Sequence, residues 1–178
     1  MVYLFLAEGF EETEALVPLD MLRRAKVEVK TVGVTGSEVK GSHGIRVIAD
    51  ISPEEVGEDI DMVILPGGMP GTTNLEADET VQAAIDRAAE KGKLIAAICA
   101  APMILGNKGL LEGKDAICYT GFEKFLKGAN IITERGVVRD GNIITARGAG
   151  VAMQFGFALV AALCGNEAAE EVKKAVLY

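Results

Sequence analysis

The chain has 178 residues, 25% of them charged and 49% hydrophobic, which is ordinary for a single folded domain spanning residues 1–178. Its formal net charge of -8 argues against nucleic acid or an anionic membrane as the main partner, because both require basic patches. The chain has one histidine, so zinc sites with several histidines are excluded and no metal site is expected.

The three cysteines are Cys99, Cys118 and Cys164, an odd number with wide spacing. This pattern argues against a disulfide framework or a thiolate metal site, and a reducing, cytoplasmic setting is the simplest interpretation. The segment Met1–Ala7 lacks the basic start and the long apolar run of a signal peptide. No apolar stretch approaches the length of a membrane span.

Short apolar runs alternate with longer helical patterns in the first half of the chain. The apolar runs predict strands at Val2–Leu6, Val27–Val34 and Ile60–Leu65. Apolar spacing predicts helices at Glu12–Ala25 and Asp78–Glu90. Between them, the glycine-broken segment Glu38–Asp50 predicts a small hairpin or an irregular excursion.

The alternation continues in the second half. A buried strand is predicted at Leu94–Ile98, followed directly by a helix at Cys99–Gly106. Later strands are expected at Ala116–Tyr119, Ile131–Thr133 and Asn142–Thr145, with a turn at Val137–Asp140 and Gly141 before the last. Helices are expected at Gly150–Leu163 and Asn166–Val176. The β-α-β-α order predicts an α/β fold, a mostly parallel sheet with helices on both faces.

Cys99 is the candidate nucleophile. It follows a buried strand, and small neighbours allow a sharp turn that projects its side chain from the carboxyl edge of the sheet, where open α/β proteins bind ligands. The same layout underlies the nucleophile elbow of hydrolases, and the helix N-terminus is expected to lower the thiol pKa. Cys118 and Cys164 are interpreted as inert packing residues, although Cys118 becomes a second oxidation site if it is exposed.

Glu14 is the candidate acid in an acidic cluster that contains Glu8, Glu11, Glu12 and Glu14. We expect Glu11 and Glu12 to be solvated residues at a helix N-terminus. Glu14 instead falls in line with an apolar stripe that includes Pro18 and Leu22, so it is expected to be buried and to need a partner. Such a carboxyl group has a raised pKa and can hold a proton near neutrality, as a general acid or base requires.

Three glycine-containing turns could contribute to a pocket. Gly67 and Gly68, with the N–H of Ala100, could form an oxyanion hole near Cys99, and a simple turn explains the two glycines equally well. Arg147–Gly150 resembles part of a dinucleotide-binding Gly-x-Gly-x-x-Gly motif, but Met153 occupies the third glycine position, so we reject that function. His43, in Gly-Ser-His-Gly, is interpreted as an exposed loop residue, with a contribution to the pocket across a dimer interface as the alternative.

With these residues in place, the chain resembles the DJ-1/PfpI/ThiJ superfamily, and within it the DJ-1-like branch. The matching segments occur in family order and span nearly the whole chain: Glu8–Glu14, Pro18–Arg24, Leu65–Gly68, Ala96–Pro102, Tyr119–Phe122 and Thr145–Gly150. The resemblance implies a flavodoxin-like three-layer sandwich and a homodimer. Thr120 and Arg147 lie in matching segments and are, with His43, possible pocket residues.

The resemblance also implies a role for each site residue. Cys99 would be the reactive cysteine, Glu14 its protonated partner, and Gly67, Gly68 and Ala100 the backbone donors. Without a cofactor or glutathione, a dicarbonyl such as methylglyoxal would add to the cysteine as a hemithioacetal and leave as a hydroxy acid. Deglycation of proteins or nucleotides is a related hydrolase activity. The alternative is a redox-sensing stress-response protein whose cysteine is oxidised to a sulfinate without significant turnover.

The chain departs from the family pattern in its histidines. The protease branch carries histidine directly after the nucleophilic cysteine, where this chain has Ala100. The DJ-1-like branch often places a histidine beside the cysteine from a later loop, but this chain has no histidine between Cys118 and Arg147. A protease is therefore not expected, and the helix dipole, the backbone donors and Glu14 are left to activate Cys99.

Overall fold

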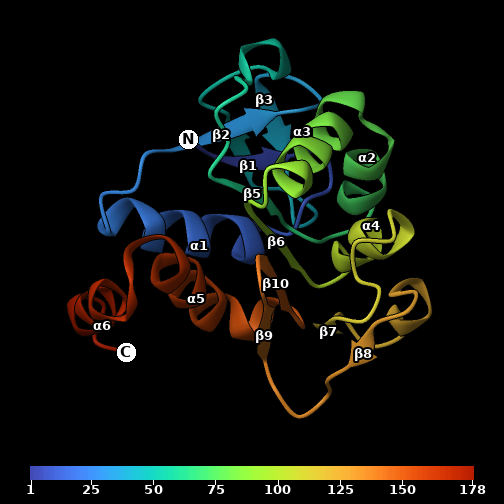
Figure 1. Ribbon diagram of the computed structural model, residues 1–178. Helices are drawn as coiled ribbons and strands as arrows, with labels where there is room; N and C mark the ends of the chain where they lie inside the picture. Colours follow the sequence, from blue (N-terminus) through green and yellow to red (C-terminus); the bar gives the residue numbers. More distant parts are fainter.

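The computed structural model describes residues 1–178, and its centre is a six-stranded sheet (Figure 1). The strands run in the order β2-β1-β5-β6-β10-β9. Their bounds are β1 Val2–Leu6, β2 Val29–Gly33, β5 Met62–Leu65, β6 Leu94–Ile98, β9 Val137–Asp140 and β10 Ile143–Ala146. The first five in this order are parallel, and β9 pairs antiparallel with β10 at the edge.

Helices cover both faces of this sheet (Figure 1). The residues of α1 Glu12–Arg24, α5 Ala152–Cys164 and α6 Asn166–Ala175 share one hydrophobic cluster with one face of the sheet. Those of α2 Gly71–Ala77, α3 Glu79–Glu90 and α4 Pro102–Asn107 share a second cluster with the other face. Every residue of β1 and β5 is buried, which explains why these strands appear in the sequence as continuous apolar runs.

Smaller elements complete the chain. The strands β3 Glu38–Lys40 and β4 Arg46–Ile48 form an antiparallel hairpin outside the main sheet. Three single-turn 3-10 helices occur at Pro53–Glu55, Glu123–Phe125 and Ala149–Val151. No helix is both long enough and apolar enough to span a membrane. The predicted fold class, an α/β sandwich with a mostly parallel sheet, is confirmed, and so is the hairpin.

The structure corrects four local predictions. The helix expected from Cys99 begins at Pro102, because the backbone of Cys99 is left-handed (φ 64°) and cannot start a helix. The turn expected at Val137–Asp140 is the edge strand β9, whose half-exposed residues lack a long apolar run. The strands expected at 116–119 and 131–133 shrink to β7 Asp115–Ala116 and β8 Asn130–Ile131, which pair only with each other. The short helix α2 was not predicted, since it has seven residues and little periodicity.

Candidate active site

Cys99 lies at the sharp turn after β6, at the carboxyl edge of the sheet. Its left-handed backbone is uncommon for a residue with a side chain and is fixed by hydrogen bonds on both sides. The Cys99 N–H donates to the carbonyl of Ala146 at 2.9 Å, and the Cys99 carbonyl accepts from the N–H of Tyr119 at 2.8 Å. The thiol is partly buried, so a small reagent has access to it.

Glu14 lies in the first turn of α1, with 1% of its surface exposed. Glu11 caps this helix by accepting the Glu14 N–H at 2.8 Å, which fixes the position of the Glu14 backbone. The Glu14 carboxylate accepts the N–H of Gly67 at 2.9 Å, and its interactions with the Cys99 thiol and the Ala149 N–H both lower its pKa. A Cβ on Gly67 would lie 2.6 Å from both Cys99 and Glu14, so the structure places the candidate acid beside the candidate nucleophile.

Gly67 and Gly68, which follow β5, have different roles in the site. Gly67 leaves no room for a side chain, because a Cβ there would lie 2.6 Å from both the Cβ of Cys99 and Oε2 of Glu14. Its N–H is already bonded to Glu14, which differs from the free oxyanion donor expected from the sequence. The backbone N–H groups of Gly68 and Ala100 instead act on the Cys99 thiol, where both lower its pKa. Two of the three predicted donors thus lie near the reactive atom.

The charges of Glu14 and Cys99 are coupled through this contact. Burial raises the pKa of Glu14 to about 7, and the negative charge of Glu11 contributes to the rise. Burial, together with the negative charge of Glu14, raises the pKa of the Cys99 thiol to about 12. The expectation that a helix dipole lowers this pKa is wrong, because α4 begins three residues later and has only six residues. Between these two pKa values, about 7 and about 12, Glu14 and Cys99 together carry one negative charge.

Thr120 and Arg147 line one cavity of about 370 Å³, which we call the Arg147 cavity. Tyr119, Gly148, Ala149 and Gly150 complete its lining. This cavity adjoins the pair, since the Ala149 N–H reaches Glu14 and a Cβ on Gly148 would lie 3.9 Å from Oε1 of Glu14. Two of the three possible pocket residues therefore share one pocket beside the candidate site.

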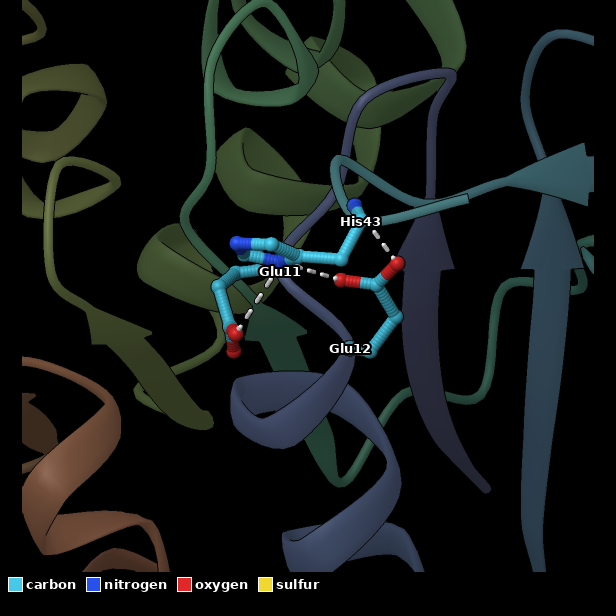
Figure 2. A group of neighbouring side chains, drawn as sticks. All are labelled: Glu11, Glu12 and His43. Atoms are coloured by element: carbon cyan, nitrogen blue, oxygen red, sulfur yellow. Dashed lines mark hydrogen bonds and ion pairs between the residues drawn. The ribbon is translucent and has the colours of Figure 1, made fainter. Parts of the chain in front are cut away.

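His43 does not line the Arg147 cavity but pairs with the start of α1 (Figure 2). Its side chain is 72% exposed, as a loop residue should be, and its Nδ1 lies 2.9 Å from Oε2 of Glu12 and 3.8 Å from Oε1 of Glu11. Glu12 is 5% exposed, so the expectation that Glu11 and Glu12 are both solvated is wrong. Glu11 is half-buried, and its carboxylate is bound as the cap of α1.

Glu12 anchors the loop between β3 and β4. Its carboxylate accepts the N–H groups of His43, at 2.8 Å, and Ile45, at 3.3 Å, and the hydroxyl of Ser42 at 3.4 Å. Burial raises the pKa of Glu12, but these bonds and the one with the His43 ring outweigh it and lower the pKa to about 2. One ligand atom from each of Glu11, Glu12 and His43 lies within 4.8 Å of the others, so these are the residues that could hold a metal ion.

The remaining cysteines differ from each other. Cys118 is 6% exposed, and burial raises its pKa to about 12, as fits a packing residue. Cys164 is exposed at the end of α5, so its interpretation as a packing residue is wrong. The helix ends near Leu163 as expected, but its last residue is not packed against the core. Sequence reasoning also missed the Ala149 N–H on Glu14, for which no sequence signal exists, and the burial of Glu12.

Comparisons with known proteins agree with this arrangement. The model of the DJ-1/PfpI family matches residues 1–162. Protein dj-1beta of Drosophila melanogaster is 37% identical over 175 residues, which cover 97% of this chain and 94% of that protein. The crystal structure of that protein matches with a TM-score of 0.94 and 36% identity, covering 99% of this chain and 97% of the other.

Two further relatives carry informative names. The glutathione-independent glyoxalase DJR-1.2 of Caenorhabditis elegans is 30% identical over 168 residues, or 94% of this chain and 90% of that protein. The oxidized DJ-1 of Toxoplasma gondii matches with a TM-score of 0.93 and 33% identity, covering 99% of this chain and 97% of the other. The resemblance found in the sequence is thereby confirmed, and the chain belongs to the DJ-1/PfpI family.

Proposed function

We propose that this protein is a glutathione-independent glyoxalase-type enzyme that converts 2-oxoaldehydes such as methylglyoxal into 2-hydroxy acids. The observation that carries the proposal is the buried Glu14 carboxyl group beside Cys99: a Cβ on Gly67 would lie 2.6 Å from each of them, and each affects the pKa of the other. This pair supplies a nucleophile and a proton carrier without histidine, glutathione or a cofactor. The name of the worm relative, a glutathione-independent glyoxalase, agrees with the proposal.

In the first step, the sulfur of Cys99 attacks the aldehyde carbon and its thiol proton moves to the Glu14 carboxylate. A carbon–sulfur bond forms, and the electron pair of the carbonyl bond moves to the aldehyde oxygen. The N–H groups of Gly68 and Ala100, which lower the pKa of the Cys99 thiol, would donate to this oxyanion. The product of the step is a hemithioacetal.

In the second step, Glu14 carries a proton between the two carbons. It gives its proton to the ketone oxygen, takes the proton from the former aldehyde carbon, and delivers it to the former ketone carbon. The oxyanion collapses to a carbonyl, so one carbon is oxidised, the other is reduced, and a thioester of the 2-hydroxy acid remains on Cys99. Water then hydrolyses the thioester, which releases the hydroxy acid and restores the thiol.

The test is turnover of methylglyoxal to lactate by the purified protein, with the Cys99→Ser and Cys118→Ser variants as a matched pair. We expect loss of turnover in Cys99→Ser and normal turnover in Cys118→Ser, because Cys118 is buried and its pKa is set by burial and the charge of Glu123, not by Glu14. Turnover that persists in Cys99→Ser would exclude the proposal. Release of free amine from a glycated peptide, measured in parallel, separates a deglycase from a glyoxalase.

A redox-sensing role is the second candidate, favoured by the donors that surround the sulfur. Oxidation of Cys99 by two molecules of peroxide transfers one oxygen from each to the sulfur and releases two waters. The resulting sulfinate oxygens could accept hydrogen bonds from Gly68, Ala100 and a protonated Glu14. Mass spectrometry after limited peroxide treatment should then find oxidation at Cys99 before the exposed Cys164; equal oxidation of both argues against this role.

A further inference from the structure

Thr120 and Arg147, which both line the Arg147 cavity, each follow a residue that is hydrogen-bonded to the backbone of Cys99. The Cys99 N–H donates to Ala146, the residue before Arg147, and the Cys99 carbonyl accepts from Tyr119, the residue before Thr120. Both segments that line the cavity are therefore tied to the backbone of Cys99. A molecule held in this cavity lies against Gly148 and Ala149, which adjoin Glu14.

The only full positive charge that lines this cavity is the guanidinium of Arg147. Arg23, Arg24 and Arg46 each have a carboxylate within ion-pair distance. Arg147 is exposed and, like Arg87, Arg135 and Arg139, has no such partner, and its side chain makes no hydrogen bond within the chain. What distinguishes it is its place in a cavity that adjoins Glu14, where a guanidinium without a carboxylate is available to an external anion.

The remainder of the lining suits the same kind of ligand. The hydroxyl of Thr120 can donate a hydrogen bond to an oxygen anion. The segment from Gly148 to Gly150 leads into α5, and a Cβ on Gly150 would meet nothing within 4 Å, so a ligand can approach this backbone closely. The cavity of about 370 Å³ has room for a substrate longer than methylglyoxal.

We propose that the Arg147 cavity is an anion subsite, and that it directs the enzyme toward 2-oxoaldehydes that carry a carboxylate two or three carbons beyond the dicarbonyl group. The inference rests on the proposed function, since the dicarbonyl end reacts at Cys99. One guanidinium balances the single charge of a carboxylate and can bind it through two parallel hydrogen bonds. A dianionic phosphate is disfavoured, because the carboxyl group of Glu14 borders the same cavity.

The first test does not require enzyme activity. 5-Bromo-4-oxopentanoate and its methyl ester alkylate the same thiol and differ in one carboxylate, placed four carbons from the reacting carbon as in the proposed substrates, so the ratio of their rates at Cys99 reports the anion subsite. We expect Arg147→Gln to slow the acid at least about 5-fold and the ester less than about 2-fold, as loss of a charge-assisted hydrogen bond implies. Arg147→Lys should retain part of the preference. Arg87→Gln, on the opposite face of the sheet, is the matched control and should leave both rates unchanged.

The second test compares 4,5-dioxopentanoate with its methyl ester as substrates. For the wild type we expect the acid to have a KM at least about 10-fold below that of the ester, and for Arg147→Gln we expect the two values to converge with little change in kcat. If methylglyoxal is turned over but the acid shows no such advantage, the anion subsite is wrong. If neither methylglyoxal nor the acid is turned over, the proposed function fails, and an Arg147-independent alkylation ratio would then also exclude the subsite.

Discussion

At the scale of single residues, the chemistry of the candidate site depends on one proton shared by Glu14 and Cys99. Because the two groups are in contact, their titrations belong to the pair: the first proton leaves near pH 7 and the second near pH 12. Between these values the remaining proton can reside on oxygen or on sulfur. In the form with the proton on Glu14, the carboxyl group donates to a thiolate, which is the reactive species.

The pair therefore predicts the pH dependence of thiol alkylation. In the wild type, the rate of Cys99 alkylation by iodoacetamide should rise with pH through a midpoint near 7, following the first deprotonation, for which the pKa of Glu14 is about 7. In Glu14→Gln the shared proton is absent, and burial raises the pKa of the isolated thiol, so the midpoint should move to higher pH. A profile that is unchanged in Glu14→Gln would show that Cys99 titrates alone.

Glu12 and His43 form a second titrating pair whose consequence is stability. The pKa of Glu12 lies below its ordinary value of 4.5. The Glu12 carboxylate therefore stabilises the fold fully above pH 4.5, and this stabilisation is lost as the pH falls toward 2. The hydrogen bond and the charge of Glu12 raise the pKa of His43 above its ordinary value of 6.5. The protonated His43 therefore stabilises the fold fully below pH 6.5, and this stabilisation is lost as the pH rises through the raised pKa. The pair stabilises the fold most between these limits.

Glu12→Gln should therefore be most destabilising near pH 5.5, by about 1–3 kcal/mol, because it weakens the bonds that hold the buried carboxylate. Urea unfolding at about pH 5.5 and about pH 9 measures the difference, which should be smaller at the higher pH. The control is His43→Gln. In that background the destabilisation caused by Glu12→Gln should be the same at both pH values, while the three bonds donated to Glu12 by the backbone and Ser42 stay in place. Equal destabilisation by Glu12→Gln at both pH values would contradict the coupling.

At the scale of elements, three turns meet at the carboxyl edge of the sheet. The turn after β5 supplies Gly67 and Gly68, the turn after β6 supplies Cys99 and Ala100, and the segment after β10 supplies Ala149. Helix α1 adds Glu14 from the side, where its neighbours in the core cluster pack against α5. The site is precise because each contributing segment follows a buried strand or lies within a buried helix.

Gly67→Ala tests the closest approach between these elements. The φ angle of Gly67 is not in the left-handed region, so the added methyl group acts by its volume alone, within 2.6 Å of Cys99 and Glu14. Displacement of the pair should lower kcat for methylglyoxal by about 10–100-fold while the far-UV circular dichroism spectrum remains native. Gly57→Ala is the control, because its methyl group would meet only the Tyr3 hydroxyl at 3.4 Å. Full activity in Gly67→Ala would mean that the contact does not matter for chemistry.

The elements that could be predicted are those with a strong periodic signal. The predicted and the observed bounds of β1 and of β6 are the same, because both strands are apolar runs bounded by turns. The start of α4 could not be found, since nothing in Cys99-Ala100-Ala101 reveals a left-handed cysteine. The edge strand β9 was hidden because one of its faces is exposed, so it has only a short alternation.

The same limit applies to the candidate site. Cys99 and Glu14 could be singled out because one follows a buried strand and the other lies in an apolar stripe. The sequence could not assign the Gly67 N–H to Glu14 rather than to an oxyanion, because that depends on side-chain positions across 53 residues of separation. Nor could it identify Glu12 as buried, since its partners lie on a hairpin more than 30 residues away.

At the scale of the whole molecule, the hairpin formed by β3 and β4 presents apolar side chains to solvent. Ile45 is 53% exposed and Ile48 is 78% exposed. The hairpin is held to the start of α1 by Glu12, so its position is linked to the segment that carries Glu14. Exposed isoleucines on a fixed element favour a protein partner, and the family resemblance makes a second copy of this chain the simplest one.

We therefore predict a homodimer that uses this hairpin. Sedimentation equilibrium of the wild type should give twice the chain mass of 18.7 kDa, and Ile48→Lys should shift the equilibrium toward monomer, because a charge buried in an apolar interface without a partner is unfavourable. Ile131→Lys is the matched control, as Ile131 is 37% exposed on β8, away from the hairpin. A monomeric wild type would refute the dimer, whereas a dimer that resists Ile48→Lys but not Ile131→Lys would move the interface to the other end of the molecule.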